Sequence, residues 1–348
     1  MSNLSSVFHL ALRDWHAAAG ATFDVRMGWT LPMRYGNPND EYAALRESAV
    51  VFDRSHRSRF LVVGADALDV LRAAIAGHVE ELEEGRAMRA AVLDDDGLIG
   101  DLVLVARTGG IAYLVIGEPG QRIATLQRLN AAIQPDFDAR VDDRTETTCL
   151  VGIAGPAAPQ VAIEHLSEAL PSRLKPLNCF TFEFHGFRAL GIRTSDTGED
   201  GFELMLAPAV AQHVFDTLRG AGIRLAGFET LEAARIEAAI PAYTPDLETG
   251  LSPAEADLDT LLEVPGGRDS RILTGLLLDA PNSPVTGTAL TLEGETVGEI
   301  RSAIASPGLN ATIALGIIDS RYALPGRILD ADGARATVVA KPFYRKRG

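Results

Sequence analysis

A carboxylate beside a turn is the first candidate for chemistry in this sequence. Residues 194–204 read Thr-Ser-Asp-Thr-Gly-Glu-Asp-Gly-Phe-Glu-Leu and lie between apolar runs at Phe187–Ile192 and Phe202–Leu206. Apolar runs around a polar segment that contains glycines predict two strands and a tight connection. Side chains alternate along a strand, so Glu203 is expected on the face opposite its apolar neighbours. Pattern alone favours a face that points to water.

Other reactive residue types do not predict a nucleophile or a metal site. Ser55 precedes His56, but adjacent strand residues point to opposite faces, so a catalytic serine–histidine pair is not expected. Asp94–Gly97 lacks the ligand spacing of a calcium loop and is typical of a hairpin turn. Cys149 and Cys179 form neither a metal-binding pattern nor a disulfide framework, which favours a reducing cytoplasm. We therefore expect no metal.

The charge balance excludes two broad classes of partner. The 348 residues carry a formal net charge of −15, whereas nucleic acids and anionic membranes bind clustered basic faces. The compact basic cluster Arg54, Arg57 and Arg59 is interpreted as a solvated face. Leu4–Ala19 lacks the pattern of a signal peptide, and the apolar runs fall short of the roughly 20 residues of a membrane helix. We expect no nucleic-acid and no membrane partner.

The elements that must position these residues indicate a mixed α+β protein. The chain exceeds the roughly 250–300 residues at which single cores stop growing, so more than one domain is expected. As far as Pro241, helical and strand patterns alternate. Helices are expected at Val7–Ala19, Asp40–Ser48, Asp66–Ala76, Gln121–Ala132, Pro208–Gly220 and Glu229–Ala239. Further strands are expected at Arg59–Val63, Leu102–Ala106, Ile111–Ile116, Thr147–Ile153, Phe180–Phe184 and Arg188–Ile192.

The C-terminal part, from Leu273 onward, reads as short strands separated by turn signals. This pattern predicts a small antiparallel barrel or sandwich. The expected strands are Gly275–Leu278, Ala289–Leu292, Val297–Ile304, Ile313–Ile318 and Thr337–Ala340.

Stretches spread over almost the whole chain resemble the aminomethyltransferase (T-protein) family of the glycine cleavage system and its folate-binding relatives. The segment Gly28–Gly36 resembles Gly-Trp-x-Met-Pro-x-x-Tyr, and Arg46–His56 resembles Arg-x-x-x-Gly-Leu-Phe-Asp-Val-Ser-His-Met. Gly97–Leu102 is similar to Gly-Gly-Ile-x-Asp-Asp-Leu, and the stretch ending in Glu203 is similar to Gly-Tyr-Thr-Gly-Glu-Asp-Gly-Phe-Glu. Weaker similarities, to Arg-Leu-Glu-Ala, to the Pro-x-Glu-Ala segment and to the family's ending, lie at Arg235–Ala238, Glu248–Ala256 and Pro342–Tyr344.

The resemblance implies a fold of three domains in a cloverleaf around a tetrahydrofolate channel. The implied folate-binding domain is discontinuous and comprises residues 1–52 and 141–245. Residues 53–140 form the implied second α+β domain, and residues 271–348 form the implied antiparallel β-barrel. The activity that the resemblance implies is transfer of an aminomethyl or methyl carbon to tetrahydrofolate, from a small-molecule donor or from a lipoyl carrier protein.

Site residues follow from the same resemblance. Glu203 matches the glutamate that holds the pterin ring, and a carboxylate suits that ring because it accepts parallel hydrogen bonds from neighbouring N–H groups. Asp101 matches the aspartate near the reactive folate nitrogens, where it could steer or accept a proton. Tyr113 resembles a tyrosine that lines the folate, and core packing is its alternative role.

The chain also departs from the family pattern. Arg57 replaces a methionine, Asp196 a tyrosine, and Leu231 an arginine that helps to hold the folate. We hypothesise that Arg57 supplies the charge missing at Leu231. The stretch Val264–Arg268 stands where the family has Lys-x-Phe-Ile-Gly-Arg.

These departures leave alternatives open. One is a non-catalytic folate-binding accessory protein of the type that maintains iron–sulfur enzymes, although the Lys-Gly-Cys-Tyr-x-Gly-Gln-Glu motif of such proteins is absent from the sequence. Another is a tetrahydrofolate-dependent demethylase, which shares the fold and cofactor but takes its methyl group from a small molecule. An acidic surface is an awkward partner for an acidic carrier protein, which favours a small-molecule donor.

Overall fold

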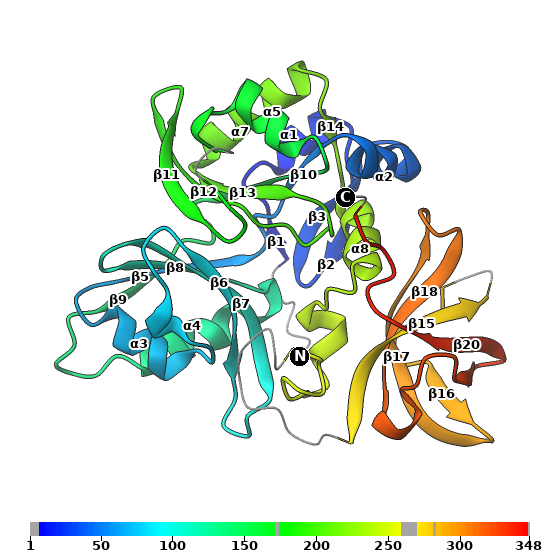
Figure 1. The fold of residues 1–348 in the computed structure, drawn as a ribbon. Coiled ribbons are helices and arrows are strands. Elements are labelled where there is room, and N and C mark those ends of the chain that lie inside the picture. Colours follow the sequence, from blue (N-terminus) through cyan, green and yellow to red (C-terminus); the bar gives the residue numbers. More distant parts are fainter. Residues whose placement is uncertain (1–6, 171–173, 259–269, 281–282, 347–348) are drawn as a thin grey trace, which may run out of the picture. The chain divides into compact units, whose positions relative to one another are not determined.

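The computed structural model describes residues 7–170, 174–258, 270–280 and 283–346 (Figure 1). The stretch Val264–Arg268 lies outside the described residues. The chain divides into two compact units, which are described separately. The first unit comprises Met1–Val92, Asp101–Ser195 and Glu199–Leu231, and the second comprises Leu93–Gly100, Asp196–Gly198 and Glu232–Gly348.

A six-stranded sheet of the first unit carries Glu203. Its order is β11-β12-β13-β10-β4-β14, and all neighbours are antiparallel except β4 and β14. The strands are β4 (Val50–Asp53), β10 (Cys149–Ala154), β11 (Cys179–Phe184), β12 (Phe187–Ile192), β13 (Gly201–Leu206) and β14 (Arg224–Leu225). Both apolar runs that flank the polar stretch at residues 194–200 are therefore strands, as predicted.

The two faces of this sheet have different partners. On one face, Phe202 and Leu204 belong to an apolar cluster with Val161 of α5 (Ala158–His165) and Phe215 of α7 (Pro208–Gly220). On the other face, a second cluster joins Leu190 of β12 to strands of another sheet. Neither face is left to water, because helices cover one and a sheet covers the other.

That second sheet has five strands in the order β6-β7-β8-β5-β9. Leu104 and Ile116 face the six-stranded sheet, whereas Val105 and Tyr113 pack with the helices. The alternation of side chains along each strand separates the two sets. The strands are β5 (Ser58–Val63), β6 (Ala87–Leu93), β7 (Ile99–Gly109), β8 (Ala112–Gly117) and β9 (Arg140–Asp143), and the helices are α3 (Ala67–Ala74) and α4 (Arg122–Ala131).

The N-terminal segment differs from the helix expected at Val7–Ala19. Helix α1 covers only Arg13–Ala18, and Phe8–His9 form strand β1, which pairs in parallel with β3. Pairing with a strand distant in sequence overrides the local helical pattern. The three-stranded sheet has the order β1-β3-β2, with β2 at Thr22–Arg26 and β3 at Trp29–Arg34.

The remaining helices lie close to their predicted positions. The expected turn at Asp94–Gly97 is confirmed, since the Gly97 N–H donates to the Asp94 carbonyl. Helix α2 is Pro38–Glu47 and α8 is Phe228–Glu237, and the short helical turns are η1 (Val79–Glu81), η2 (Pro119–Gln121), η3 (Tyr243–Leu247) and η4 (Ser320–Tyr322).

The C-terminal strands close into an antiparallel barrel with the order β15-β18-β17-β16-β19-β20. Leu276, Ile300 and Ile318 lie in its apolar core. The strands are β15 (Arg271–Asp279), β16 (Ala289–Leu292), β17 (Glu295–Ser306), β18 (Ala311–Asp319), β19 (Ile328–Ala331) and β20 (Ala334–Val339). The predicted α+β class and C-terminal barrel are confirmed, while the predicted domain limits at residues 52, 140 and 245 remain predictions. Within the described residues, the structure has no helix long and apolar enough to span a membrane.

Candidate active site

Glu203 occupies a buried position between the two larger sheets of the first unit. On β13 it lies opposite Gly152 of β10 and Ile192 of β12. The residue is 3% exposed, so the expectation of a water-facing carboxylate is wrong. The physical reason is the five-stranded sheet, whose residues are remote in sequence from β13 and cover this face.

Gly152 keeps space next to Glu203 for an aromatic ring. Phe52 of β4 is the cross-strand partner of Gly152, and a Cβ on the glycine would come within 2.1 Å of a Phe52 ring carbon. A larger residue at position 152 would therefore push this ring out of place. Phe52, Gly152 and Glu203 thus form one row across the sheet, in which the glycine lets the ring lie beside the carboxylate.

Two guanidinium groups flank Glu203. Arg54 Nε and Arg57 Nη1 each lie 3.9 Å from the Oε1 atom of Glu203. The side chains of Arg54, Arg57 and Glu203 are 14%, 9% and 4% exposed, so water screens these charges less than it would at the surface. The Oε2 atom of Glu203 is buried and has no hydrogen-bond partner among the described residues. Since an unpaired buried acceptor costs about 1–3 kcal/mol, Oε2 is a candidate contact for a donor on a ligand.

The interpretation of Arg54, Arg57 and Arg59 as a solvated face is therefore wrong. Arg59 is fully buried and donates to the backbone carbonyls of Ser55 and Thr148 at 3.1 and 2.9 Å. The reason is topological, because residues 54–57 connect β4 of one sheet to β5 of the other. Their side chains consequently lie where the two sheets meet.

His56 presents a neutral imidazole beside these charges. Burial, reinforced by the nearby Arg54 guanidinium, lowers the pKa of His56 to about 3. Its Nδ1 atom is buried without a hydrogen-bond partner in the described part of the chain, and its ring lies 6.2 Å from that of Phe228 in an edge-on arrangement. The neighbouring Ser55 hydroxyl accepts a hydrogen bond from the Leu150 N–H at 2.9 Å, a backbone contact rather than one with His56.

Asp101 is fully buried at the end of the five-stranded sheet. Its Oδ1 accepts from the Glu118 N–H at 3.0 Å, and its Oδ2 accepts from the Thr125 hydroxyl of α4 at 2.6 Å. Burial raises the pKa of Asp101 to about 7, although both hydrogen bonds act in the opposite direction. Such a pKa suits a group that exchanges a proton near neutral pH. Both oxygens of Asp101 are engaged within the protein.

A chain of polar contacts links Asp101 to Glu203. The backbone of Glu118 bonds to Asp101, and the Glu118 carboxylate lies 3.5 Å from Arg57. Arg57 in turn lies near Glu203. Three predicted site residues, Asp101, Arg57 and Glu203, are thus joined through Glu118, which the sequence analysis did not single out.

Tyr113 lies apart from this chain. It is 2% exposed and belongs to the apolar cluster with α3 and α4, on the face of β8 that points away from the six-stranded sheet. The guanidinium of Arg107 lies over its ring at 5.5 Å. These apolar surroundings favour core packing, the alternative role of Tyr113, over a contact with the folate. Leu231, which replaces the family arginine, is likewise buried on α8.

Sequence reasoning missed Arg54, Glu118, Thr125 and Ser58 as members of this site. Arg54 carried a signal, because it stands where the quoted family motif has valine. Glu118 follows the end of β8 with no motif to mark it, and Thr125 reaches Asp101 only because α4 packs on the sheet. Ser58 Oγ is buried without a hydrogen-bond partner in the described residues.

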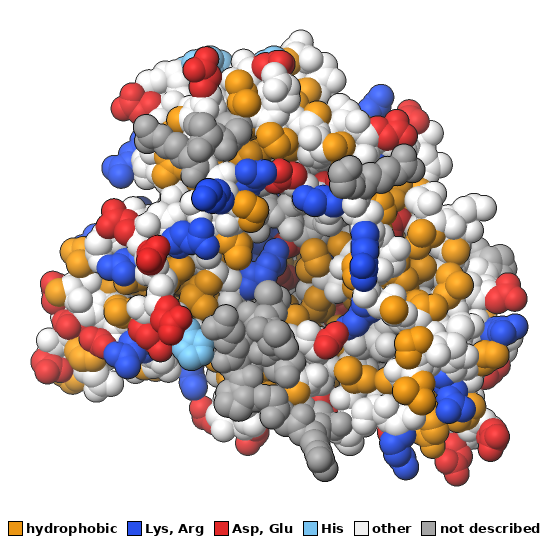
Figure 2. Space-filling model, in the orientation of Figure 1, with side chains coloured by type: hydrophobic (Ala, Val, Ile, Leu, Met, Phe, Trp, Pro, Cys, Tyr) orange, Lys and Arg blue, Asp and Glu red, His pale blue; other side chains and the backbone are white. Residues whose placement is uncertain are grey.

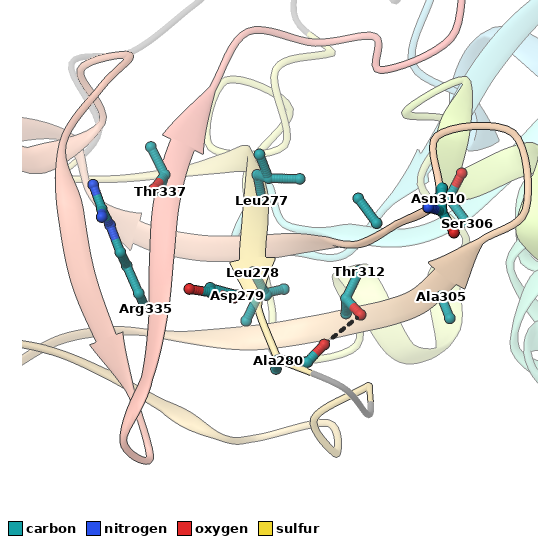
Figure 3. A pocket seen from close by; sticks show the side chains of 11 residues that line it. Leu277, Leu278, Asp279, Ala280, Ala305, Ser306, Asn310, Thr312, Arg335 and Thr337 are labelled. Carbon is teal, nitrogen blue, oxygen red and sulfur yellow. Dashed lines mark hydrogen bonds between the residues drawn. The ribbon is translucent and has the colours of Figure 1, made fainter.

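A separate groove lies on the barrel of the second unit (Figure 3). It has a volume of about 770 Å³, and its charged lining residues, Asp279 and Arg335, are both exposed. None of its described lining residues is a predicted site residue. Within the described residues, no group of three or more histidine, cysteine or acidic side chains could hold a metal ion.

Comparisons with known proteins match nearly the whole chain to one family. Residues 12–265 match the family described as the GCVT N-terminal domain, and residues 271–345 match the glycine cleavage T-protein C-terminal barrel domain. An aminomethyltransferase of Streptomyces avermitilis is 33% identical, over 97% of this chain and 98% of that protein. One from Streptomyces coelicolor is 31% identical, over 97% of both chains.

A solved structure has the same fold. The crystal structure of glycine cleavage system aminomethyltransferase T from Bartonella henselae superposes with a TM-score of 0.88 over 98% of this chain and 99% of that chain. The sequences are 22% identical, so the likeness concerns the fold.

Proposed function

This chain belongs to the glycine cleavage T-protein family of aminomethyltransferases, and from that premise we propose that it transfers a one-carbon unit to tetrahydrofolate. The observation that carries the proposal is the Oε2 atom of Glu203, a buried acceptor with no hydrogen-bond partner among the described residues. The N–H edge of a pterin ring would donate the hydrogen bond that this oxygen lacks. A charge-assisted hydrogen bond of this kind orients a ring as well as binding it.

The residues around Glu203 fit such a ring. Phe52 and the neutral His56 offer apolar and aromatic surface, and the two arginines keep Glu203 next to positive charge. Tetrahydrofolate would supply the amine nitrogen that receives the one-carbon unit. We assign the orientation of the ring to Glu203. Arg54 and Arg57 are the cations beside that carboxylate, each 3.9 Å from its Oε1 atom.

Asp101 is proposed as the group that holds a proton near the site. Its raised pKa places both protonation states within reach at neutral pH. Because both of its oxygens bond within the protein, its protonation state would act on the site through Glu118 and Arg57.

The donor is proposed to be a small molecule rather than a lipoyl carrier protein, in a cytoplasmic enzyme. The formal net charge of −15 opposes association with an acidic carrier. A small donor meets no such long-range barrier.

Calorimetric titration with tetrahydrofolate tests the folate site. We expect Glu203→Gln to weaken binding about 10- to 150-fold, the equivalent of the roughly 1.5–3 kcal/mol of a hydrogen bond to a charged group. Glu183→Gln is the matched control, because Glu183 is an exposed residue of the same sheet and should bind like the parent. Absence of binding by the parent protein would refute the proposal, and so would equal binding by the two variants.

A further inference from the structure

A cleft opens between the two larger sheets of the first unit, away from Asp101. Its volume is about 540 Å³, within the roughly 300–1,000 Å³ that is usual for small-molecule sites. Ala112, the first residue of β8, lines the cleft, whereas Gly117, the last residue of that strand, lies beside Asp101. The described lining residues include neither Asp101 nor Glu203. The cleft is therefore separate from the site described above.

The two walls of the cleft are apolar surfaces that face each other. Leu61 and Val63 of β5 form one wall, because they alternate with residues of the same strand that pack against the helices. Leu190 and Met205 form the other wall, and both belong to the apolar layer that joins the two sheets. Leu61, Val63 and Met205 remain partly exposed. A ligand that entered the cleft would thus cover apolar surface on both sides.

A cation stands at the rim of the cleft. Arg188 of β12 lines the cleft, is exposed, and has no ion pair or hydrogen bond with the described residues. Its cross-strand partner Glu183 is not among the described lining residues. Thr181, which pairs with Leu190, is the diagonal neighbour of Arg188, and such neighbours lie about 7–8 Å apart. One anionic head group could therefore contact both the guanidinium and the hydroxyl.

This combination of surfaces defines the ligand. A guanidinium only donates hydrogen bonds and matches the two oxygens of a carboxylate, while the apolar walls suit a chain of methylene groups. The formal net charge of −15 opposes the binding of anions where no local cation offsets it. We propose that the cleft binds an aliphatic monocarboxylate, with its chain between the sheets and its carboxylate on Arg188. This inference does not depend on the folate site.

Calorimetric titration of the full chain with hexanoate, octanoate and decanoate tests the proposal. We expect one molecule per chain, and each added methylene group should tighten binding about two- to fourfold. Arg188→Gln should weaken the binding of decanoate about threefold or more, because it removes the cation at the rim. Thr181→Trp should weaken it about tenfold or more, because the indole ring would fill the cleft. Aromatic residues suit strands, so this variant is expected to fold.

Two control variants locate the binding. Arg224→Gln makes the same change of charge at an exposed residue of β14, at the other edge of the sheet, and should bind decanoate like the parent. Glu203→Gln should also bind it like the parent, and weaker binding by this variant would place the carboxylate in the folate site and overturn the inference.

Other outcomes also decide against the cleft. No binding by the parent, an affinity independent of chain length, or equal binding by Arg188→Gln and Arg224→Gln would each overturn the proposal. Thermal unfolding establishes that the variants are folded, and if Thr181→Trp does not fold, Arg188→Gln and the chain-length series decide. None of these results bears on the binding of tetrahydrofolate, which is measured separately.

Discussion

Burial moves the pKa values of Asp101 and His56 in opposite directions, because a site with little water disfavours the charged form of each group. It raises the pKa of Asp101 to about 7 and, together with Arg54, lowers the pKa of His56 to about 3. At neutral pH His56 is therefore a fixed neutral ring. Asp101 is the one of the two that changes protonation there.

We expect Asp101→Asn to flatten the dependence of the unfolding free energy on pH between about 4 and about 7. In the unfolded chain the carboxyl group ionises near its ordinary pKa of about 3.9. The folded state keeps the proton up to a pKa of about 7, so stability falls as pH rises between these values and is constant above them. Urea unfolding at about pH 4.5 and about pH 7.5 should show the parent losing on the order of 1–3 kcal/mol more than the variant. Parallel profiles would contradict the assignment.

At the scale of elements, the ends of three strands meet around Asp101. It lies near the start of β7, and Gly117 at the end of β8 is the cross-strand partner of Ser58 at the start of β5. A Cβ on Gly117 would come 2.4 Å from Asp101 Oδ2 and 2.8 Å from Ser58 Oγ. Glycine at this strand end is therefore what allows the carboxyl group to be buried there.

Gly117→Ala should accordingly lower the unfolding free energy by about 1–3 kcal/mol, the usual cost of overpacking. The added methyl group would displace Asp101 from the Thr125 hydroxyl and the Glu118 N–H. Gly110→Ala is the control, because Gly110 lies in the loop between β7 and β8 and a Cβ there would meet nothing within 4 Å. It should change stability by no more than about 0.5 kcal/mol. Equal effects of the two substitutions in urea unfolding would show that the contact with Asp101 is unimportant.

At the scale of the whole molecule, charge distinguishes the two kinds of donor. The chain carries a formal net charge of −15, although the face drawn in Figure 2 shows basic and acidic side chains interspersed. Repulsion between acidic proteins extends over about 30 Å at 0.01 M salt and about 8 Å at 0.15 M. This repulsion would oppose the approach of an acidic carrier protein, whereas it would not act on a small neutral donor.

The rate of one-carbon transfer at low and at physiological salt tests the proposal of a small donor. With a small neutral donor, we expect a rate that changes less than about twofold, because no protein association is involved. With an acidic lipoyl carrier protein, raising the salt should strengthen association by screening the repulsion. Faster turnover with the carrier than with every small donor, at both salt concentrations, would contradict the proposal.

Local pattern predicted much of the fold. The start at Pro208 and the end at Gly220 of α7 agree with the structure, because proline and glycine act within one or two residues of themselves. The alternation along β13 correctly separated Glu203 from Phe202 and Leu204. The helical pattern gave a wrong prediction at Phe8–His9, where pairing with β3 prevails over helical periodicity.

The sequence by itself determined the fold class, the strand face of Glu203 and the family resemblance, because each rests on local patterns and short motifs that can be read without knowing which segments meet in the fold. Only the tertiary structure decided that this face is buried and that Arg54 and Arg57 lie against Glu203. It also decided that Asp101 reaches Glu203 through Glu118 and Arg57. The physical reason is that burial and charge pairing depend on which distant part of the chain covers a face of a sheet. Here the five-stranded sheet covers the face that carries Glu203.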